Sequence, residues 1–515
     1  MIAEQSAYRR CKKYFAPILR YEIRRIMVTM KREKFGSRLG FILVSAGCAI
    51  GIGNVWKFPY ICGVYGGAAF ILIYLAFLLI LGIPVLVFEF AVGRGSRKSV
   101  ALSFEELAPG GTLWHRLKYI GIFGCYLLMM FYTMVGGWMM YYCYRSLTGE
   151  FTGATPEQIG NAFGGMLQDL PTMVFWTILI CIIGFAVCML GLKSGVERIT
   201  KWMMAALLLI MLVLAVHSVF LEGAMEGIRF YLVPDFQRMV ESGIGNVVFA
   251  ALSQAFFTLS LGIGAMLIFG SYLGRSHSLT GEAVSITALD TFVALTAGFI
   301  VIPACFAYGI EPGAGPSLVF ITLPNIFAQM PGGFLWSSLF FLFLTFAALS
   351  TIIAVFENII AFDMDLFGWT RQKSVLVSAV LIILLSMPAV LGYNVLSMIQ
   401  PLGEGSTIMD LEDFIVSNNL LPLGSLGYVL FCTRKNGWGW DNFIAEANAG
   451  TGRAFPKGLK NYAAYGIPLI IVVIYLKGYY DMFVGKGPVM LAGWMTAAVV
   501  FLLFVFYCAV GKKRA

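Results

Sequence analysis

The residues that most specifically indicate a chemical function lie in the stretch 45–59, inside a long apolar segment. Gly47, Gly51 and Gly53 interrupt this segment, and the polar Asn54 follows directly. Because each glycine costs roughly 1 kcal/mol relative to alanine in a helix interior, the stretch predicts a membrane helix broken near its middle. Irregular backbone at that depth is tolerated only where it is buried in protein or lines a cavity. Free carbonyls there can bind a cation and the next half-helix can bind an anion, so we expect a small zwitterion with companion cations.

A second interruption of the same kind lies in the stretch 254–264. Here Thr258 and Ser260 precede a second Gly-Ile-Gly sequence at residues 262–264. A glycine-rich face that packs closely against a neighbouring helix would explain either stretch alone. Two interruptions at corresponding places in two halves of a chain instead indicate the binding site of a transporter.

The composition predicts an all-α polytopic membrane protein. Of the 515 residues, 59% are hydrophobic and 12% are charged, whereas soluble domains average about 25% charged residues. A spanning helix needs about 20 mostly apolar residues. We predict twelve such segments, centred near residues 48, 79, 130, 181, 208, 260, 295, 346, 385, 424, 470 and 499.

The distribution of basic residues predicts a cell-membrane protein with both termini in the cytoplasm. Most of the 36 Lys and Arg residues lie in segments that an internal N-terminus places inside, and the outer segments 148–171, 310–333 and 395–405 contain none. This bias accounts for most of the net charge of +9, so nucleic-acid binding is not expected. The basic arm 1–34 lacks the apolar core and small-residue cleavage site of a signal peptide. It is either a plain topogenic tail, which we favour, or an arm that lies on anionic lipid.

Catalysis is not expected from this sequence. The ten Cys residues occur singly and the three His residues are isolated, so neither a disulfide framework nor a metal or redox centre is indicated. No nucleophile–base pair is evident. We therefore expect neither an enzyme nor an organic cofactor.

Several motifs occur in an order that resembles the neurotransmitter:sodium symporter family, in particular its prokaryotic members. The resemblance extends from about Lys31 to the end of the chain. Its motifs are residues 38–59, 88–94, the spacing of Tyr132 and Trp138, 256–264, 347–351, Asp413 with 420–424, and the outer-loop sequence 311–316.

The resemblance implies a leucine-transporter-like fold of twelve transmembrane helices. Spans 1–5 and 6–10 would form a five-plus-five inverted repeat in which spans 1 and 6 are broken. Residues 35–434 would then form the transport core. Residues 435–515 would add spans 11 and 12 and a short cytoplasmic C-terminus.

The resemblance also implies a binding site for an amino acid. The substrate carboxylate would contact the backbone amides of Ile52 and Gly53 and the hydroxyl of Tyr132. The ammonium group would contact carbonyls and one hydroxyl at the two breaks, in Ala49, Phe257, Thr258 and Ser260. The side-chain pocket would be apolar, which indicates a hydrophobic amino acid. Its lining would be Leu128, Phe257, Ile263 and Val355.

Two sodium sites are implied by the same resemblance, and their hard oxygen ligands suit a hard cation. The hydroxyls of span eight could instead bond to the preceding turn of their own helix, but the family spacing favours the sodium site. Sodium site 1 would use Ala49, Asn54, Thr258, Asp290 and the substrate carboxylate. Sodium site 2 would use Gly47, Ile50, Ala347, Ser350 and Thr351.

Charged residues near the ends of the spans would form gates. Lys57 and Asp413 match the outer pair of the family, although lysine lacks the bidentate fork of the usual arginine and direct pairing is less expected. The inner network would be Arg32, Tyr272 and Asp365. Because charge at membrane depth is costly, we expect Glu89 and Glu357 to be buried against donors at helix ends.

Two further departures from the family pattern concern the binding site. Cys48 stands at the floor of the pocket, where other members have a different small polar residue. Asp290 replaces an amide at the place where chloride-requiring members hold their anion, and Ala294 offers no hydroxyl there. The implied anion cradle is Tyr74, Gln254, Thr258, Asp290 and Ala294. A fixed carboxylate would repel chloride, so chloride-independent transport is expected.

Together these observations predict a sodium-coupled symporter of amino acids that works by alternating access in a lipid bilayer. One alternative is a sensor of the same fold that has lost transport. Another is a symporter of a different small zwitterion. A channel would need a polar stripe through the whole bilayer, whereas the polar groups cluster at one depth.

Overall fold

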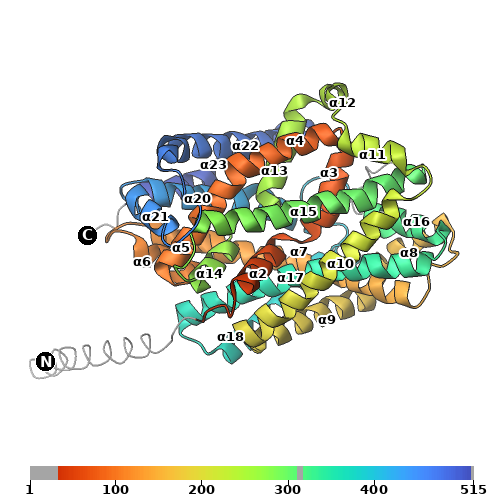
Figure 1. Cartoon of the computed structure of the whole chain (residues 1–515), viewed down its shortest axis with the longest axis horizontal. Helices are drawn as coiled ribbons and strands as arrows, with labels where there is room; N and C mark the ends of the chain where they lie inside the picture. The colour runs from red at the N-terminus through yellow and green to blue at the C-terminus, as the bar shows by residue number, and fades with distance from the viewer. Residues whose placement is uncertain (1–32, 310–316, 512–515) are drawn as a thin grey trace, which may run out of the picture. The chain divides into compact units, whose positions relative to one another are not determined.

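The computed structural model describes residues 33–309 and 317–511, and every regular element in these residues is a helix. The described residues from Phe35 onward form one compact unit (Figure 1). Residues 1–32 of the basic arm and all of the outer-loop sequence 311–316 lie outside the described residues. The expected boundary at residue 434 stays a prediction.

The elements follow one another as α-helices joined by short loops or by π-helical turns. In the first half they are α2 (Arg38–Ala49), η1 (Gly53–Lys57), α3 (Phe58–Val64), α4 (Ala68–Phe77), η2 (Leu78–Gly82), α5 (Ile83–Ser96), α6 (Val100–Leu107), η3 (Trp114–Leu117), α7 (Lys118–Leu147), α8 (Pro156–Gln168), α9 (Leu170–Met189), η4 (Leu192–Glu197), α10 (Arg198–Val219), α11 (Ala224–Leu232) and α12 (Phe236–Glu241). In the second half they are α13 (Ile244–Thr258), α14 (Ala265–Tyr272), α15 (Leu279–Ala307), η5 (Leu318–Thr322), α16 (Leu323–Gln329), α17 (Gly333–Phe367), α18 (Arg371–Leu391), α19 (Ile408–Ile415), η6 (Val416–Leu420), α20 (Leu421–Thr433), α21 (Trp440–Ala447), η7 (Lys457–Leu459), η8 (Tyr462–Gly466), α22 (Ile467–Phe483), η9 (Val484–Lys486) and α23 (Pro488–Val510).

The predicted spans all correspond to helical segments. Among the described residues, ten helices are long and apolar enough to cross a membrane, and the bent pair Arg38–Ala49 and Gly53–Val64 raises the number to 11. The segment predicted around residue 260 consists of α13 and α14, each too short to span alone, separated by residues 259–264. Both predicted helix breaks are therefore present.

The two broken helices begin two successive sets of five spans, as predicted. A set of five spans crosses the membrane an odd number of times, so the second set starts on the opposite side from the first. The two sets therefore cross the membrane with opposite orientation, as expected of an inverted repeat. Helices α22 and α23 follow as two additional spans.

Five of the six π-helical turns among the described residues end two residues before a proline. In η1, η2, η5, η6 and η8, the residue directly before the proline donates its backbone N–H to the carbonyl five residues earlier. A proline has no N–H, and its ring clashes with the carbonyl four residues earlier in an α-helix. The wider π-turn moves that carbonyl aside, so the helix continues through the proline. These prolines are Pro59, Pro84, Pro324, Pro422 and Pro468.

Glu89 of α5 stabilises the second helix break. Its Oε2 accepts a hydrogen bond from the Gly262 N–H at 2.9 Å, and its Oε1 accepts one from the Leu267 N–H at 3.4 Å. The first amides of a helix have no partner within the helix, so the fully buried carboxylate satisfies the start of α14. The prediction that Glu89 is buried against helix-end donors is confirmed.

Candidate functional site

The first helix break leaves backbone amides that side chains must satisfy. Helix α2 ends before Ile50, whose ψ of 95° is outside the helical region. The Gly51 N–H then donates to Asn54 Oδ1 at 3.1 Å, and the Ile52 N–H donates to the Tyr132 hydroxyl at 3.0 Å. One partner is thus local, whereas Tyr132 comes from α7.

The second break is connected to the first through Ser260. Ser260, Gly262 and Gly264 have φ values of 49°, 96° and 82°, a region that is uncommon for residues other than glycine. In this conformation the Ser260 hydroxyl donates a hydrogen bond to the Cys48 carbonyl at 3.2 Å, which joins the two breaks. Backbone strain of this kind clusters at functional sites.

Four backbone carbonyls converge on the hydroxyl of Thr351 in α17. Thr351 Oγ1 lies 3.2 Å from the carbonyl oxygen of Gly47, 3.3 Å from those of Cys48 and Ile50, and 3.4 Å from that of Ala347. A hydroxyl carries one hydrogen, so it can donate to only one of these oxygens at a time. A buried cluster with this excess of acceptors is suited to a small hard cation.

A second cluster of oxygens lies beside Asn54. Its Nδ2 donates to Thr258 Oγ1 at 2.9 Å and to Asp290 at 2.8 Å (Oδ1) and 3.3 Å (backbone O). The Thr258 hydroxyl donates to Asp290 Oδ2 at 2.9 Å, and all three side chains are buried. Neutral donors therefore satisfy both carboxylate oxygens. If the side-chain amide of Asn54 turned by half a revolution, its Oδ1 would face Thr258 and Asp290 in place of Nδ2.

A small cavity of about 20 Å³ lies between the two breaks. The first break contributes Cys48, Ala49, Gly51 and Gly53 to its lining, and polar side chains on other elements contribute three hydroxyls. Those hydroxyls belong to Tyr132, Ser260 and Thr351. The apolar lining is Leu128, Phe257, Ile263, Val416 and Leu421.

Two predicted residues of α17 make other contacts. The Ser350 hydroxyl donates to the Ala347 carbonyl of its own helix at 3.0 Å, which is the alternative considered for span hydroxyls. Val355 is fully buried but does not line the cavity. Val416 and Leu421 take part in the lining instead. The only sequence signal for these two was the span-ten motif, which indicated no role for them.

Phe257 separates this cavity from a larger one of about 220 Å³ on the side of Lys57 and Asp413. The Lys57 ammonium group lies 4.1 Å from the centroid of the Phe257 ring, a cation–π contact. Asp413 Oδ1 accepts the Ser417 hydroxyl at 2.6 Å. In the described part of the chain no ion pair joins Lys57 to Asp413; the lysine instead covers the ring that separates the two cavities.

Two of the residues predicted for the inner gate, Tyr272 and Asp365, take part in separate contacts. The Tyr272 hydroxyl donates to Glu357 Oε1 at 2.8 Å, and Arg371 donates to both oxygens of the same carboxylate at 2.7 and 3.0 Å. Asp365 Oδ2 accepts a backbone N–H at the start of α6 at 2.6 Å. Arg32 lies outside the described residues. Glu357 is buried against donors at helix ends, as predicted: Tyr272 is the last residue of α14 and Arg371 is the first residue of α18.

Two broken helices that face one cavity, in two inverted sets of five spans, define a secondary transporter of the membrane. The profile of the sodium:neurotransmitter symporter family matches residues 32–162 and 162–411. The chain therefore belongs to this family: it is a sodium-dependent, multi-pass membrane transporter and not an enzyme.

Proteins and structures similar to this chain agree with that assignment. An uncharacterized sodium-dependent transporter of Bacillus subtilis is 35% identical over 452 residues, which cover 87% of this chain and 98% of that protein. The sodium- and chloride-dependent taurine transporter of Bos taurus is 28% identical, over 67% of this chain and 62% of that protein. The crystal structure of MhsT in complex with L-phenylalanine has 37% sequence identity and a TM-score of 0.78, over 87% of this chain and 99% of that chain. This likeness confirms the predicted fold.

We expect Gly51→Ala to abolish sodium-dependent transport. A Cβ at this position would lie 2.2 Å from the Tyr132 hydroxyl oxygen and 2.7 Å from Thr351 Oγ1. Both side chains would have to leave the first break, and overpacking of this kind costs about 1–3 kcal/mol. Uptake by reconstituted protein and thermal unfolding in detergent are the measurements. Gly165→Ala in α8, where the added Cβ meets nothing within 4 Å, is the control. Wild-type uptake by Gly51→Ala would contradict this geometry.

Proposed function

We propose that this protein is a sodium-coupled symporter of hydrophobic amino acids that works by alternating access and does not require chloride. The observation that carries the proposal is the carbonyl cluster around Thr351, directly beside a cavity between two helix breaks. The cluster suits a cation and the breaks suit a zwitterion at the same depth. The L-phenylalanine bound to MhsT supports an amino acid as the substrate.

The substrate carboxylate binds to the amides of Ile52 and Gly53 and to the Tyr132 hydroxyl in this proposal. The Ile52 N–H already donates to that hydroxyl at 3.0 Å, so the two groups are close enough to bind one anion. The ammonium group binds to carbonyls at both breaks and to one hydroxyl. These acceptors are Ala49, Phe257, Thr258 and Ser260.

Two sodium ions accompany the substrate. At site 1, Asp290 supplies the charge and Ala49, Asn54, Thr258 and the substrate carboxylate supply further oxygens, once the Asn54 amide presents Oδ1. At site 2, Thr351 and the carbonyls of the first break supply the oxygens. The complete set at site 2 is Gly47, Ile50, Ala347, Ser350 and Thr351. Because the substrate carboxylate completes site 1, sodium and substrate raise each other's affinity.

Alternating access requires a barrier on each side of the cavity. On the outer side, Phe257 is the lid and Lys57 holds its ring, while Asp413 lies across the larger cavity. On the inner side, the Tyr272–Glu357–Arg371 contact and Asp365 are the barrier. The distribution of Lys and Arg supports cytoplasmic termini.

Chloride independence follows from the surroundings of Asp290. Tyr74 and Gln254 are implied for the anion cradle of chloride-requiring relatives, and the Tyr74 hydroxyl is buried without a hydrogen-bond partner among the described residues. Gln254 Nε2 already donates to the Gly53 carbonyl at 3.0 Å, and the remaining Oε1 is an acceptor that cannot bind an anion. A chloride ion among them would lie near the Asp290 carboxylate, and the two charges would repel each other. The buried Ala294 supplies no hydroxyl to offset that repulsion.

The direct test is uptake of radiolabelled amino acids into proteoliposomes. With an inward sodium gradient we expect uptake of apolar amino acids, and with potassium in place of sodium we expect none. Screening the twenty amino acids identifies the substrate. Failure of every amino acid to be taken up or bound would overturn the proposal, and binding without uptake would favour the sensor.

Thr351→Val tests sodium site 2. The substitution keeps the shape of the side chain and removes the hydroxyl on which four carbonyls converge. A lost bond to a charged group costs about 1.5–3 kcal/mol, so sodium affinity should fall roughly 10- to 100-fold. Sodium titrations of substrate binding provide the measurement. Thr345→Val on the same helix, whose hydroxyl bonds to the Phe341 carbonyl at 2.7 Å, is the control. Equal sodium affinities in both variants would refute the site.

Asp290→Asn tests the origin of chloride independence. Wild-type uptake should be equal in chloride and gluconate, whereas this variant should lose activity or acquire a halide requirement. Asp363→Asn is the control, because Asp363 is also buried but bonds to the Ser378 hydroxyl in α18 at 2.8 Å. An absolute requirement of the wild type for chloride would contradict the argument.

A further inference from the structure

The cavity between the breaks has a wall that comes from span ten. Val416 of η6 and Leu421 of α20 both line it, together with residues of the first break. Val416 is fully buried and Leu421 is 3% exposed. Since the breaks bind the charged end of the substrate in the proposed function, the substrate side chain extends toward the apolar lining.

The π-helical turn explains why both side chains face the cavity. In an α-helix, residues five apart point about 140° away from each other. Here the Leu421 N–H donates to the Val416 carbonyl, which is the hydrogen bond of a π-turn. A π-turn contains more residues than an α-helical turn, so this bond reduces the angle between the Val416 and Leu421 side chains. Pro422 favours the turn, because it cannot follow an undistorted α-helix without a clash.

The wall is fixed at two places. Asn419 Oδ1 accepts hydrogen bonds from the hydroxyls of Tyr479 and of Tyr475, the latter at 2.9 Å, so α22 holds η6 between the two residues of the wall. At Leu421, a Cβ on Gly262 would lie 2.2 Å from the carbonyl oxygen. This close backbone approach places Leu421 against the second break.

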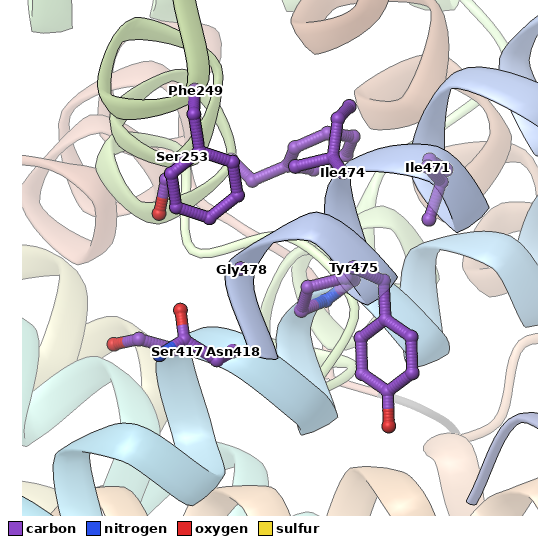
Figure 2. Close-up of a pocket in the computed structure, with 10 residues that line it drawn as sticks. Phe249, Ser253, Ser417, Asn418, Ile471, Ile474, Tyr475 and Gly478 are labelled. Carbon is purple, nitrogen blue, oxygen red and sulfur yellow. The ribbon is translucent and has the colours of Figure 1, made fainter. Parts of the chain in front are cut away.

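The opposite face of the same turn contributes to a separate small pocket. Figure 2 shows Ser417 and Asn418 of η6 together with Phe249 and Ser253 of α13 and Tyr475 of α22. Residues 416 and 421 thus face the substrate cavity, whereas residues 417 and 418 face a pocket bounded by α13 and α22. The direction of the Val416 and Leu421 side chains therefore depends on the π-turn.

We propose that Val416 and Leu421 set the size of the amino-acid side chain that this transporter accepts. The inference rests on the proposed function and deepens it. The two side chains form the apolar wall against which the end of the substrate packs. Removing methyl groups from them creates room for a larger substrate, and adding one excludes it.

The test is equilibrium competition binding by purified protein in sodium, with alanine, valine, leucine, phenylalanine and tryptophan as competitors. Val416→Ala and Leu421→Ala should each shift the affinity ratio of large to small amino acids about tenfold toward the large ones, since one methylene in an apolar pocket changes discrimination by roughly 10–200-fold. Val416→Ile should shift the ratio the opposite way. Because affinity ratios are compared, a general loss of stability cancels. Leu421→Val is a milder variant should Leu421→Ala fail to fold.

Two matched controls keep the test specific. Leu423→Ala and Val429→Ala remove the same groups from buried positions of α20 that do not line the cavity, and both should keep the wild-type ratios. Wild-type ratios in the Val416 and Leu421 variants would overturn this inference while leaving the proposed function intact. Absence of amino-acid binding by the wild-type protein would instead overturn the proposed function and this inference with it.

Discussion

Backbone groups freed at membrane depth must find partners inside the protein, because lipid offers none. The structure depends on this constraint at its two helix breaks. Glu89 satisfies the amides at the start of α14, and Tyr132 and Asn54 satisfy those of the first break. Ser260 connects one break to the other. The breaks are therefore stable only where several spans surround them, and the binding cavity lies in that place.

The partners of the first break are also the groups that the proposed ligands would contact. Tyr132 binds the Ile52 amide where a carboxylate would bind, and the Asn54 amino group lies among the oxygens that sodium would contact. The Thr351 hydroxyl lies within hydrogen-bond distance of four carbonyls but can donate to only one of them at a time. Ligand binding would thus exchange hydrogen bonds already present for ionic contacts. The polar groups of the site would then have partners both with and without bound ligands. Such a site can release its ligands, and a transporter requires that release.

Some of the prolines share one structural role in this fold, whereas Pro303 and Pro388 lie inside α15 and α18 without a preceding π-turn. Five prolines each follow a π-helical turn, and the turn lets the helix continue although one N–H is missing. At η1 and η6 the turn lies beside the cavity, where π-helical turns frequently mark functional sites. A π-helical turn before a proline therefore has a purely structural role in η2, whereas in η6 it also contributes to the lining of the cavity between the breaks.

Much of the fold and part of the candidate site could be predicted from the sequence. Apolar length predicts the spans, and glycines within them predict both breaks, because these properties act over a few neighbouring residues. The capping role of Glu89 followed from its depth and charge. Only the tertiary structure decided that Lys57 lies on Phe257, that Arg371 holds Glu357, and that span ten lines the cavity. These contacts join residues on different helices, so they depend on how the helices pack and on the rotation that one π-turn adds.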